Sequence, residues 1–259
     1  MTDVPVYLSP SSIGTYRSCP QKFKLSRIDR IPEPPTWATH LGTFVHEVLE
    51  HLYQQPSESR TVEGLRTLAG SLWTDNEWES KVLSLAERKG EPRDFKVAAF
   101  ACMTNLWQLE DPSRTELDGM EHEVNCEVEG VALKGYIDRF VFADDGTVVI
   151  SDYKTGKVPN PRFTPENDKF FQLLAYALML DASDQETTSK VQLYYLNEPV
   201  VHELEVTPQR LSVATGTIVE SKEAVDASMS SGDFHCNVTK LCDWCHYKAT
   251  KVCPAFSGS

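Results

Sequence analysis

The chain has 259 residues, of which 41% are hydrophobic and 24% are charged, as is typical of a globular protein with a sizeable core. No apolar run approaches the roughly 20 residues of a membrane-spanning helix, and the first ten residues lack the basic and apolar regions of a signal peptide, so we expect a cytoplasmic protein. The net charge of −13 excludes a protein that binds DNA over its whole surface, because such proteins displace counterions with excess lysine and arginine.

The N-terminal region is predicted to be helical up to a proline-rich linker. Ser9 is a suitable N-cap, and Pro10 suits the first helical position. A basic amphipathic segment follows at 21–31, and the sequence PEPP at 32–35 predicts a rigid linker. From Gly42 onward, apolar residues recur at helical spacing, which predicts a second helix.

The rest of the chain is predicted to alternate between helices and strands. Residues 61–118 contain amphipathic helical patterns but no recognisable chemistry, which favours a helical insertion. Strand patterns begin near Glu121 and predict a meander of about three strands, followed by a helix, two further strands and a last amphipathic helix. This order predicts one α/β domain over 1–259 with an open central sheet.

The hairpin at 135–155 sets the positions of three charged side chains. If its turn consists of residues 144–146, Asp138 lies directly opposite Asp152, with the Cβ atoms roughly 5 Å apart. Lys154 then lies on the same face, two residues beyond Asp152. The apolar residues of that face, which we expect to be buried, are Phe140, Phe142, Val148 and Ile150. A two-residue turn would put the two acids on opposite faces, and the hydrophobic pattern leaves both registers open.

The three charged residues favour a metal-dependent hydrolytic centre over a chance cluster at the end of a strand. Two carboxylates this close repel each other unless a cation lies between them. Mg²⁺ or Mn²⁺ suits oxygen ligands, polarises a phosphate and lowers the pKa of water. Lys154 is placed to stabilise charge that develops on the phosphate, or to orient water.

Four sequence motifs resemble one enzyme family. GYIDR followed by DYKTG resembles the signature of the PD-(D/E)XK nucleases, in the form found in RecB-like exonucleases. GTFVHEVLE resembles the helix that precedes the sheet in that family, and QLLAY resembles its Q-x-x-x-Y helix motif. The motifs stand in the family's order, and the resemblance covers most of the chain except 61–118. It implies a PD-(D/E)XK nuclease core, with a central mixed sheet flanked by helices.

The resemblance also implies roles for individual residues. The implied metal ligands are His46, Asp138, Asp152 and the carbonyl oxygen of Tyr153. The implied catalytic residues are Lys154, Asp138, Asp152, Gln172 and Tyr176. Gln172 and Tyr176 share one helix face, from which they would reach a DNA phosphate or the lysine. Glu50 lies one turn after His46 and is placed to orient it, and Glu123 is a further acidic candidate on the strand that enters the sheet.

The cysteines predict a second metal centre. Cys242, Cys245 and Cys253 are spaced C-x2-C-x7-C, and the fourth ligand is either Cys236, which would give a local zinc site, or Cys19. TYRSCPQKF and CDWCHYKATKVCP resemble the cysteine motifs of RecB-like nucleases with iron–sulfur clusters. That resemblance implies a [4Fe–4S] cluster on Cys19, Cys242, Cys245 and Cys253, with residues 236–256 packing against the Cys19 region.

The two remaining cysteines, Cys102 and Cys126, lie among apolar residues, which predicts that they are core thiols.

The expected function is that of a metal-dependent DNA exonuclease acting on single-stranded ends, in DNA repair, recombination or phage DNA processing. One alternative is a CRISPR-associated nuclease that trims DNA before spacer integration. Another is a non-catalytic nucleic-acid-binding protein with a structural zinc ion. The complete set of Asp138, Asp152 and Lys154 argues against the latter, because a decayed site has no reason to keep all three.

Overall fold

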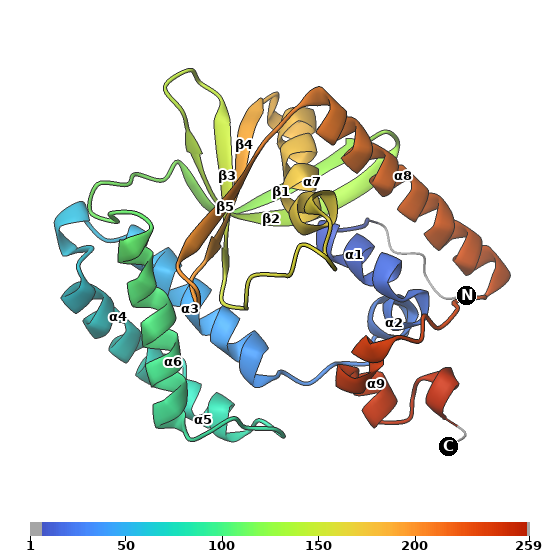
Figure 1. Cartoon of the computed structure of the whole chain (residues 1–259), viewed down its shortest axis with the longest axis horizontal. Coiled ribbons are helices and arrows are strands. Elements are labelled where there is room, and N and C mark those ends of the chain that lie inside the picture. The colour runs from blue at the N-terminus through green and yellow to red at the C-terminus, as the bar shows by residue number, and fades with distance from the viewer. Residues whose placement is uncertain (1–6, 258–259) are drawn as a thin grey trace.

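The architecture was analysed in a computed structural model, which describes residues 7–257 (Figure 1). The first six residues, part of the stretch from which we expect no signal peptide, lie outside this range. Within the described range, no helix is both long and apolar enough to cross a membrane.

The N-terminal helices follow their capping residues. Helix α1 (Pro10–Ser18) starts after Ser9, whose side chain accepts a hydrogen bond from the backbone of Ser12. Helix α2 (Pro20–Phe23) and the π-helical turn η1 (Lys24–Ile28) follow. Helix α3 (Trp37–Tyr53) begins five residues before the predicted start at Gly42, because Thr36 caps it.

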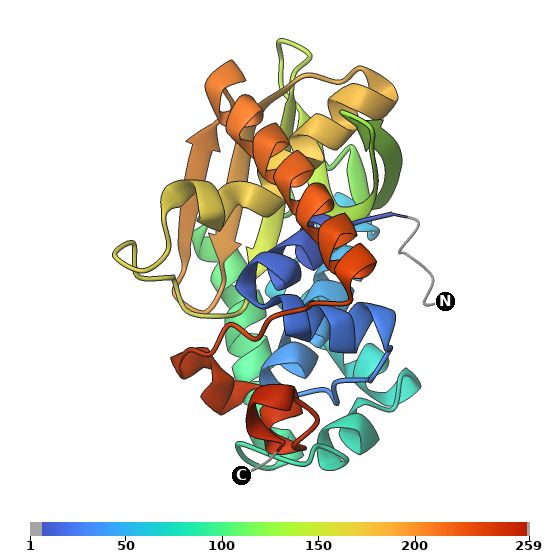
Figure 2. The same cartoon turned by 90° about the vertical axis from the view of Figure 1, so that its right-hand side faces the viewer.

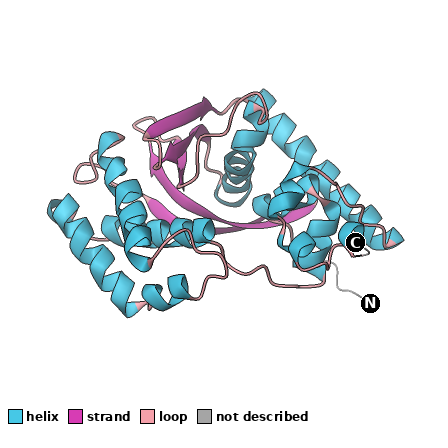
Figure 3. Ribbon diagram, turned by 60° about the horizontal axis from the view of Figure 1, so that its bottom comes forward, coloured by secondary structure: helices cyan, strands magenta, loops and turns pink. Residues whose placement is uncertain are grey.

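A helical layer follows α3 in the chain. It consists of α4 (Val62–Asp75), α5 (Trp78–Leu83), α6 (Pro92–Thr104) and a short 3-10 turn, η3 (Asn105–Gln108). Phe44 of α3 packs against Trp73, Trp78 and Phe95 of this layer, in a core that also includes Tyr153 and Tyr194 from the sheet. Figure 3 shows these helices on one side of the sheet.

The sheet has five strands in the order β1-β2-β3-β4-β5. Their bounds are β1 (Gly119–Val128), β2 (Val131–Phe142), β3 (Val148–Lys154), β4 (Thr188–Tyr195) and β5 (Val200–Glu205). Neighbouring strands are antiparallel except β3 and β4, which are parallel and are therefore joined by a crossover that contains α7 (Glu166–Asp184).

A second core lies between this sheet and the helices α7 and α8 (Pro208–Ser231), and it includes Ile137, Ile150, Leu174 and Ile218. The predicted α/β fold with a mixed central sheet flanked by helices is therefore confirmed.

The register of the β2–β3 hairpin is that of the three-residue turn. Ala143 donates to the carbonyl of Thr147 at 2.7 Å, and Arg139 pairs with Ser151, so the next position places Asp138 opposite Asp152. The prediction that Phe142 is buried is wrong, since 44% of its surface is exposed. Phe142 ends β2 beside the turn, where the hairpin extends beyond the covering helices (Figure 1).

The C-terminal segment returns to the N-terminal helices (Figure 2). The amide of Gln21 donates to the carbonyl of His235 at 3.2 Å, and the side chain of Asn237 donates to the carbonyl of Ser18 at 2.9 Å. Beyond α9 (His246–Ala249) the chain continues to Cys253. The hydroxyl of Tyr247 in α9 donates to the carbonyl of Ile31 at 2.8 Å, so these hydrogen bonds join the two ends of the chain.

Candidate metal centre and cysteine cavity

Three of the expected metal ligands meet where β2 and β3 approach α3. One ligand atom each from His46, Asp138 and Asp152 lies within 4.8 Å of the other two. His46 comes from α3, Asp138 from β2 and Asp152 from β3, so the hairpin register and the position of one helix determine the whole group.

His46 is oriented by the backbone and lies beside one carboxylate. Its Nε2 lies 2.8 Å from the carbonyl oxygen of Tyr153, the fourth expected ligand, and its Nδ1 lies 3.3 Å from Oδ2 of Asp138. A small cavity beside His46 is lined by Glu50, whose side chain accepts a hydrogen bond from Gln54 at 3.3 Å. Burial lowers the pKa of His46, so its imidazole is neutral at neutral pH and able to donate a lone pair.

The two carboxylates lie in an unfavourable environment. The Oδ2 atoms of Asp138 and Asp152 are both buried and make no hydrogen bond of normal geometry with the described residues, although the ammonium of Lys154 forms an ion pair with Asp152. Burial, together with the charge of Asp152, raises the pKa of Asp138 well above its usual range. Two carboxylate oxygens, one imidazole and one carbonyl form a donor set that fits a hard divalent cation such as Mg²⁺ or Mn²⁺.

The raised pKa of Asp138 gives a prediction about stability. A carboxyl group whose pKa is raised on folding costs stability as the pH rises from its unfolded pKa through its folded one. In EDTA at neutral pH, Asp138→Asn should therefore raise the Tm by a few degrees, given that about 1 kcal/mol shifts the Tm of a chain of this size by roughly 2–4 °C.

Thermal unfolding followed across pH checks this expectation. The gain should vanish below about pH 4, where the carboxyl group is protonated in both states. Asp144→Asn, which neutralises an exposed carboxylate in the hairpin turn, is the matched control and should leave the Tm unchanged. A lower Tm for Asp138→Asn than for the control at neutral pH would contradict the electrostatic explanation.

Glu121 is an acidic neighbour that the sequence reading missed. The pairs Met120–Arg139 and His122–Ile137 flank it, so it lies across from Asp138, and it has a left-handed φ of 44°. Glu121 reaches solvent but also lines the cavity with His46, and partial burial raises its pKa, assisted by the charges of Glu50 and Asp152.

The candidate Glu123 lies elsewhere. It is exposed and accepts hydrogen bonds from Lys134 at 2.9 Å and from Tyr136 at 2.5 Å.

The signal that could have identified Glu121 is the Glu129–Gly130 pair, since a two-residue turn there fixes the β1–β2 register.

Gln172 and Tyr176 meet on one face of α7. The amide of Gln172 donates to the hydroxyl of Tyr176 at 3.3 Å. Burial raises the pKa of Tyr176, and the charges of Asp138 and Asp152 add to this effect, as expected for a phenol close to both acids. The ring of Tyr176 packs against Gly135, where a Cβ atom would lie 2.6 Å from Cε1, so this close approach requires glycine.

A buried polar network lies on the opposite face of β2 from Asp138. Arg139 donates to both carboxylate oxygens of Glu110, at 2.6 and 2.8 Å, and also to the hydroxyl of Tyr153. Tyr53 of α3 donates to the same carboxylate. The network thus ties the helix that carries His46 to the strands that carry the acids, and sequence spacing did not indicate it.

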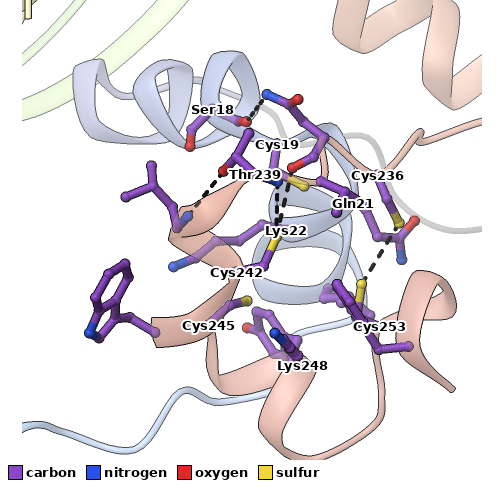
Figure 4. A pocket seen from close by; sticks show the side chains of 17 residues that line it. Ser18, Cys19, Gln21, Lys22, Cys236, Thr239, Cys242, Cys245, Lys248 and Cys253 are labelled. Carbon is purple, nitrogen blue, oxygen red and sulfur yellow. Dashed lines mark hydrogen bonds between the residues drawn. The ribbon is translucent and has the colours of Figure 1, made fainter. Parts of the chain in front are cut away.

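Five cysteines line a cavity of about 290 Å³ between the two ends of the chain (Figure 4). They are Cys19, Cys236, Cys242, Cys245 and Cys253. The sulfur atoms of Cys236 and Cys253 are 3.7 Å apart, whereas no three thiols among residues 7–257 have all their sulfur atoms within 4.8 Å of one another. Burial and the neighbouring thiol of Cys236 raise the pKa of Cys253 to about 11. Cys102 is buried and Cys126 is half-buried, both apart from this cavity.

Proteins from two mycobacterial phages are similar to this chain. The Gene 69 protein of Mycobacterium phage L5 is 24% identical, with 90% of this chain and 92% of that protein aligned. The Gene 69 protein of Mycobacterium phage D29 is 27% identical over 69% of this chain and 70% of that protein.

The fold is also found in a crystal structure from Eubacterium rectale, described as a candidate exonuclease. The TM-score is 0.57 and the identity 17%, with 93% of this chain and 87% of that chain covered. A sequence model of the PD-(D/E)XK nuclease superfamily, whose members use divalent metals, matches residues 7–254, which include both the acidic centre and the cysteine cavity. The chain therefore belongs to the PD-(D/E)XK nuclease superfamily.

Proposed function

We propose that this protein is a metal-dependent DNA exonuclease that hydrolyses phosphodiester bonds at the centre formed by His46, Asp138 and Asp152. One observation carries the proposal: three ligand atoms lie within 4.8 Å of one another, beside the ion pair of Asp152 and Lys154. A structural ion pair alone would not require a second buried carboxylate with an unsatisfied oxygen.

The proposed roles follow from the surroundings of each side chain. His46, Asp138, Asp152 and the carbonyl of Tyr153 would hold Mg²⁺ or Mn²⁺. Such an ion, when bound, supplies positive charge that polarises the phosphate and lowers the pKa of water. Lys154 keeps 37% of its side-chain surface exposed, which allows its ammonium to orient water or to stabilise charge on the phosphate oxygens. Gln172 and Tyr176 would position the substrate or the lysine.

The expected substrate is DNA with a free single-stranded end. The description of the Eubacterium rectale protein supports an exonuclease, and the phage origin of the two relatives supports phage DNA as its substrate. We also propose that residues 61–118 form a helical insertion within one nuclease domain, since their helices cover α3 rather than extend the sheet.

We propose in addition that the cysteine cavity binds a [4Fe–4S] cluster through Cys19, Cys242, Cys245 and Cys253. The proposal is supported by the convergence of these thiols from both ends of the chain on one cavity. Zinc on the same thiols is the competing possibility, and Cys236 competes with Cys19 for the fourth position because its sulfur lies 3.7 Å from that of Cys253.

Metal dependence tests the proposed activity. Incubation of the purified protein with DNA labelled at one end should release short labelled products in Mg²⁺ or Mn²⁺, and EDTA should stop the release. Single-stranded, double-stranded and covalently closed circular DNA should be compared, because an exonuclease leaves the circles intact. Cleavage of the circles would contradict end-dependent action, and no degradation with any divalent metal would contradict the nuclease itself.

A further inference from the structure

Next to the proposed metal centre lies a group of basic and aromatic side chains that the roles above do not use. Tyr195 of β4 pairs with Lys154, and His202 of β5 pairs with Leu193, which in turn pairs with Asp152. Paired residues point to the same face of a sheet, and adjacent strands are about 4.8 Å apart. His202 therefore lies two strands, or about 10 Å, from Asp152 on the face that α7 covers.

Lys169, near the start of α7, meets this group from above the sheet. Its ammonium contacts Nδ1 of His202 and lies 5.9 Å from the centre of the Tyr195 ring, while the rings of Tyr195 and His202 are 5.2 Å apart. An ammonium can donate only to an imidazole nitrogen that carries a lone pair. With Lys169 as the donor, His202 accepts at Nδ1 and carries its proton on Nε2, so both side chains have N–H groups to offer a ligand.

The Lys169–His202 contact lacks a carboxylate partner. Within the described residues 7–257, no carboxylate lies within 4.0 Å of the Lys169 ammonium, and the nearby acid Glu166 forms an ion pair with Arg210 at 3.1 Å. Partial burial lowers the pKa of both Lys169 and His202. The Lys169 ammonium is therefore a partly desolvated charge without an anionic partner, and an arriving anion would offset the cost of that desolvation.

We propose that Lys169, His202 and Tyr195 form a binding subsite for a phosphate of the nucleic-acid strand, next to the phosphate that is cleaved. The inference rests on the proposed nuclease function. The subsite lies on the same sheet face as Asp152 and Lys154, so one strand would reach both places. A second phosphate contact fixes the register of the strand at the metal centre, which favours a polymer over a free nucleotide.

Loss of the Lys169 charge tests the subsite. Binding of a fluorescent single-stranded oligonucleotide is measured by anisotropy at several salt concentrations, with Lys154→Ala as the background so that the probe stays intact. Lys169→Met should raise the Kd about tenfold, because one charge-assisted hydrogen bond is lost. It should also reduce the slope of log Kd against log salt by about 0.7, the value of one phosphate contact on a single strand. His202→Leu should also raise the Kd for the oligonucleotide.

Lys190→Met is the matched control. Lys190 lies on the other face of β4, forms an ion pair with Glu203 at 3.4 Å, and its loss changes the net charge equally. If Lys169→Met and Lys190→Met give the same Kd and the same salt slope, the subsite does not exist, even if the parent protein degrades DNA. If Lys169→Met weakens binding as described but the parent protein degrades no DNA with any metal, the subsite stands and the proposed nuclease function fails.

Discussion

Lys154→Ala should lower the rate of Mg²⁺-dependent DNA degradation by about 10³-fold, because the side chain that stabilises charge in the transition state is removed. Lys154 is the partly exposed cation of the group, and its ammonium forms an ion pair with Asp152. Its loss should leave the metal ligands in place. Rates are measured with end-labelled DNA at saturating metal, and Mn²⁺ affinity is measured on the protein alone by calorimetry.

Asp152→Asn distinguishes a metal ligand from a catalytic cation. Asparagine has nearly the shape of aspartate but loses the negative charge, so this variant should lose activity to a similar extent and should also bind Mn²⁺ at least about tenfold more weakly. Lys157→Ala removes an exposed lysine three residues after Lys154 and is the matched control for charge. Activity of Lys154→Ala above about a tenth of the control rate would exclude the proposed catalytic role.

The local parts of the centre could be predicted because turn chemistry and strand alternation act over a few residues. The three-residue turn at 144–146, which ends on Gly146 at a left-handed φ of 80°, sets the register that brings Asp138 opposite Asp152, one of the two registers that the sequence allowed. Counting strand pairs outward from the two-residue turn at Glu129–Gly130 likewise gives Glu121 as the acid across from Asp138. Without that register, the position on the strand that enters the sheet indicates Glu123, which lies two residues further along β1.

Other parts depend on tertiary packing, which no local pattern encodes. Glu110 reaches Arg139 only because the helical layer returns beside the strands, and its neighbours in sequence give no sign of a buried partner. Lys169 and His202 come from a helix and an edge strand, and they meet only after the crossover from β3 to β4 has formed. The motif that contains Gln172 indicates a functional helix, but it does not include Lys169, three residues earlier.

Cys19→Ser should strongly reduce both the iron content and the stability of the protein, because the proposed cluster joins the first helices to the last segment of the chain. Protein purified without oxygen should be brown, with broad visible absorbance and about four iron atoms per chain. Serine at position 19 should remove most of the colour and iron. It should also lower the Tm by several degrees, since ligands far apart in the sequence close a long loop.

Cys236→Ser is the matched control, because Cys236 lines the same cavity and its sulfur lies 3.7 Å from that of Cys253. If Cys19 is the fourth ligand, Cys236→Ser should keep its colour and its iron. The reverse result would assign the fourth position to Cys236 and make the site local to the C-terminal segment. Colourless wild-type protein with one zinc ion per chain would exclude the cluster, although the hydrogen bonds that join the two ends of the chain would remain. Iron content and colour thus identify the metal, while the two serine variants identify the ligand.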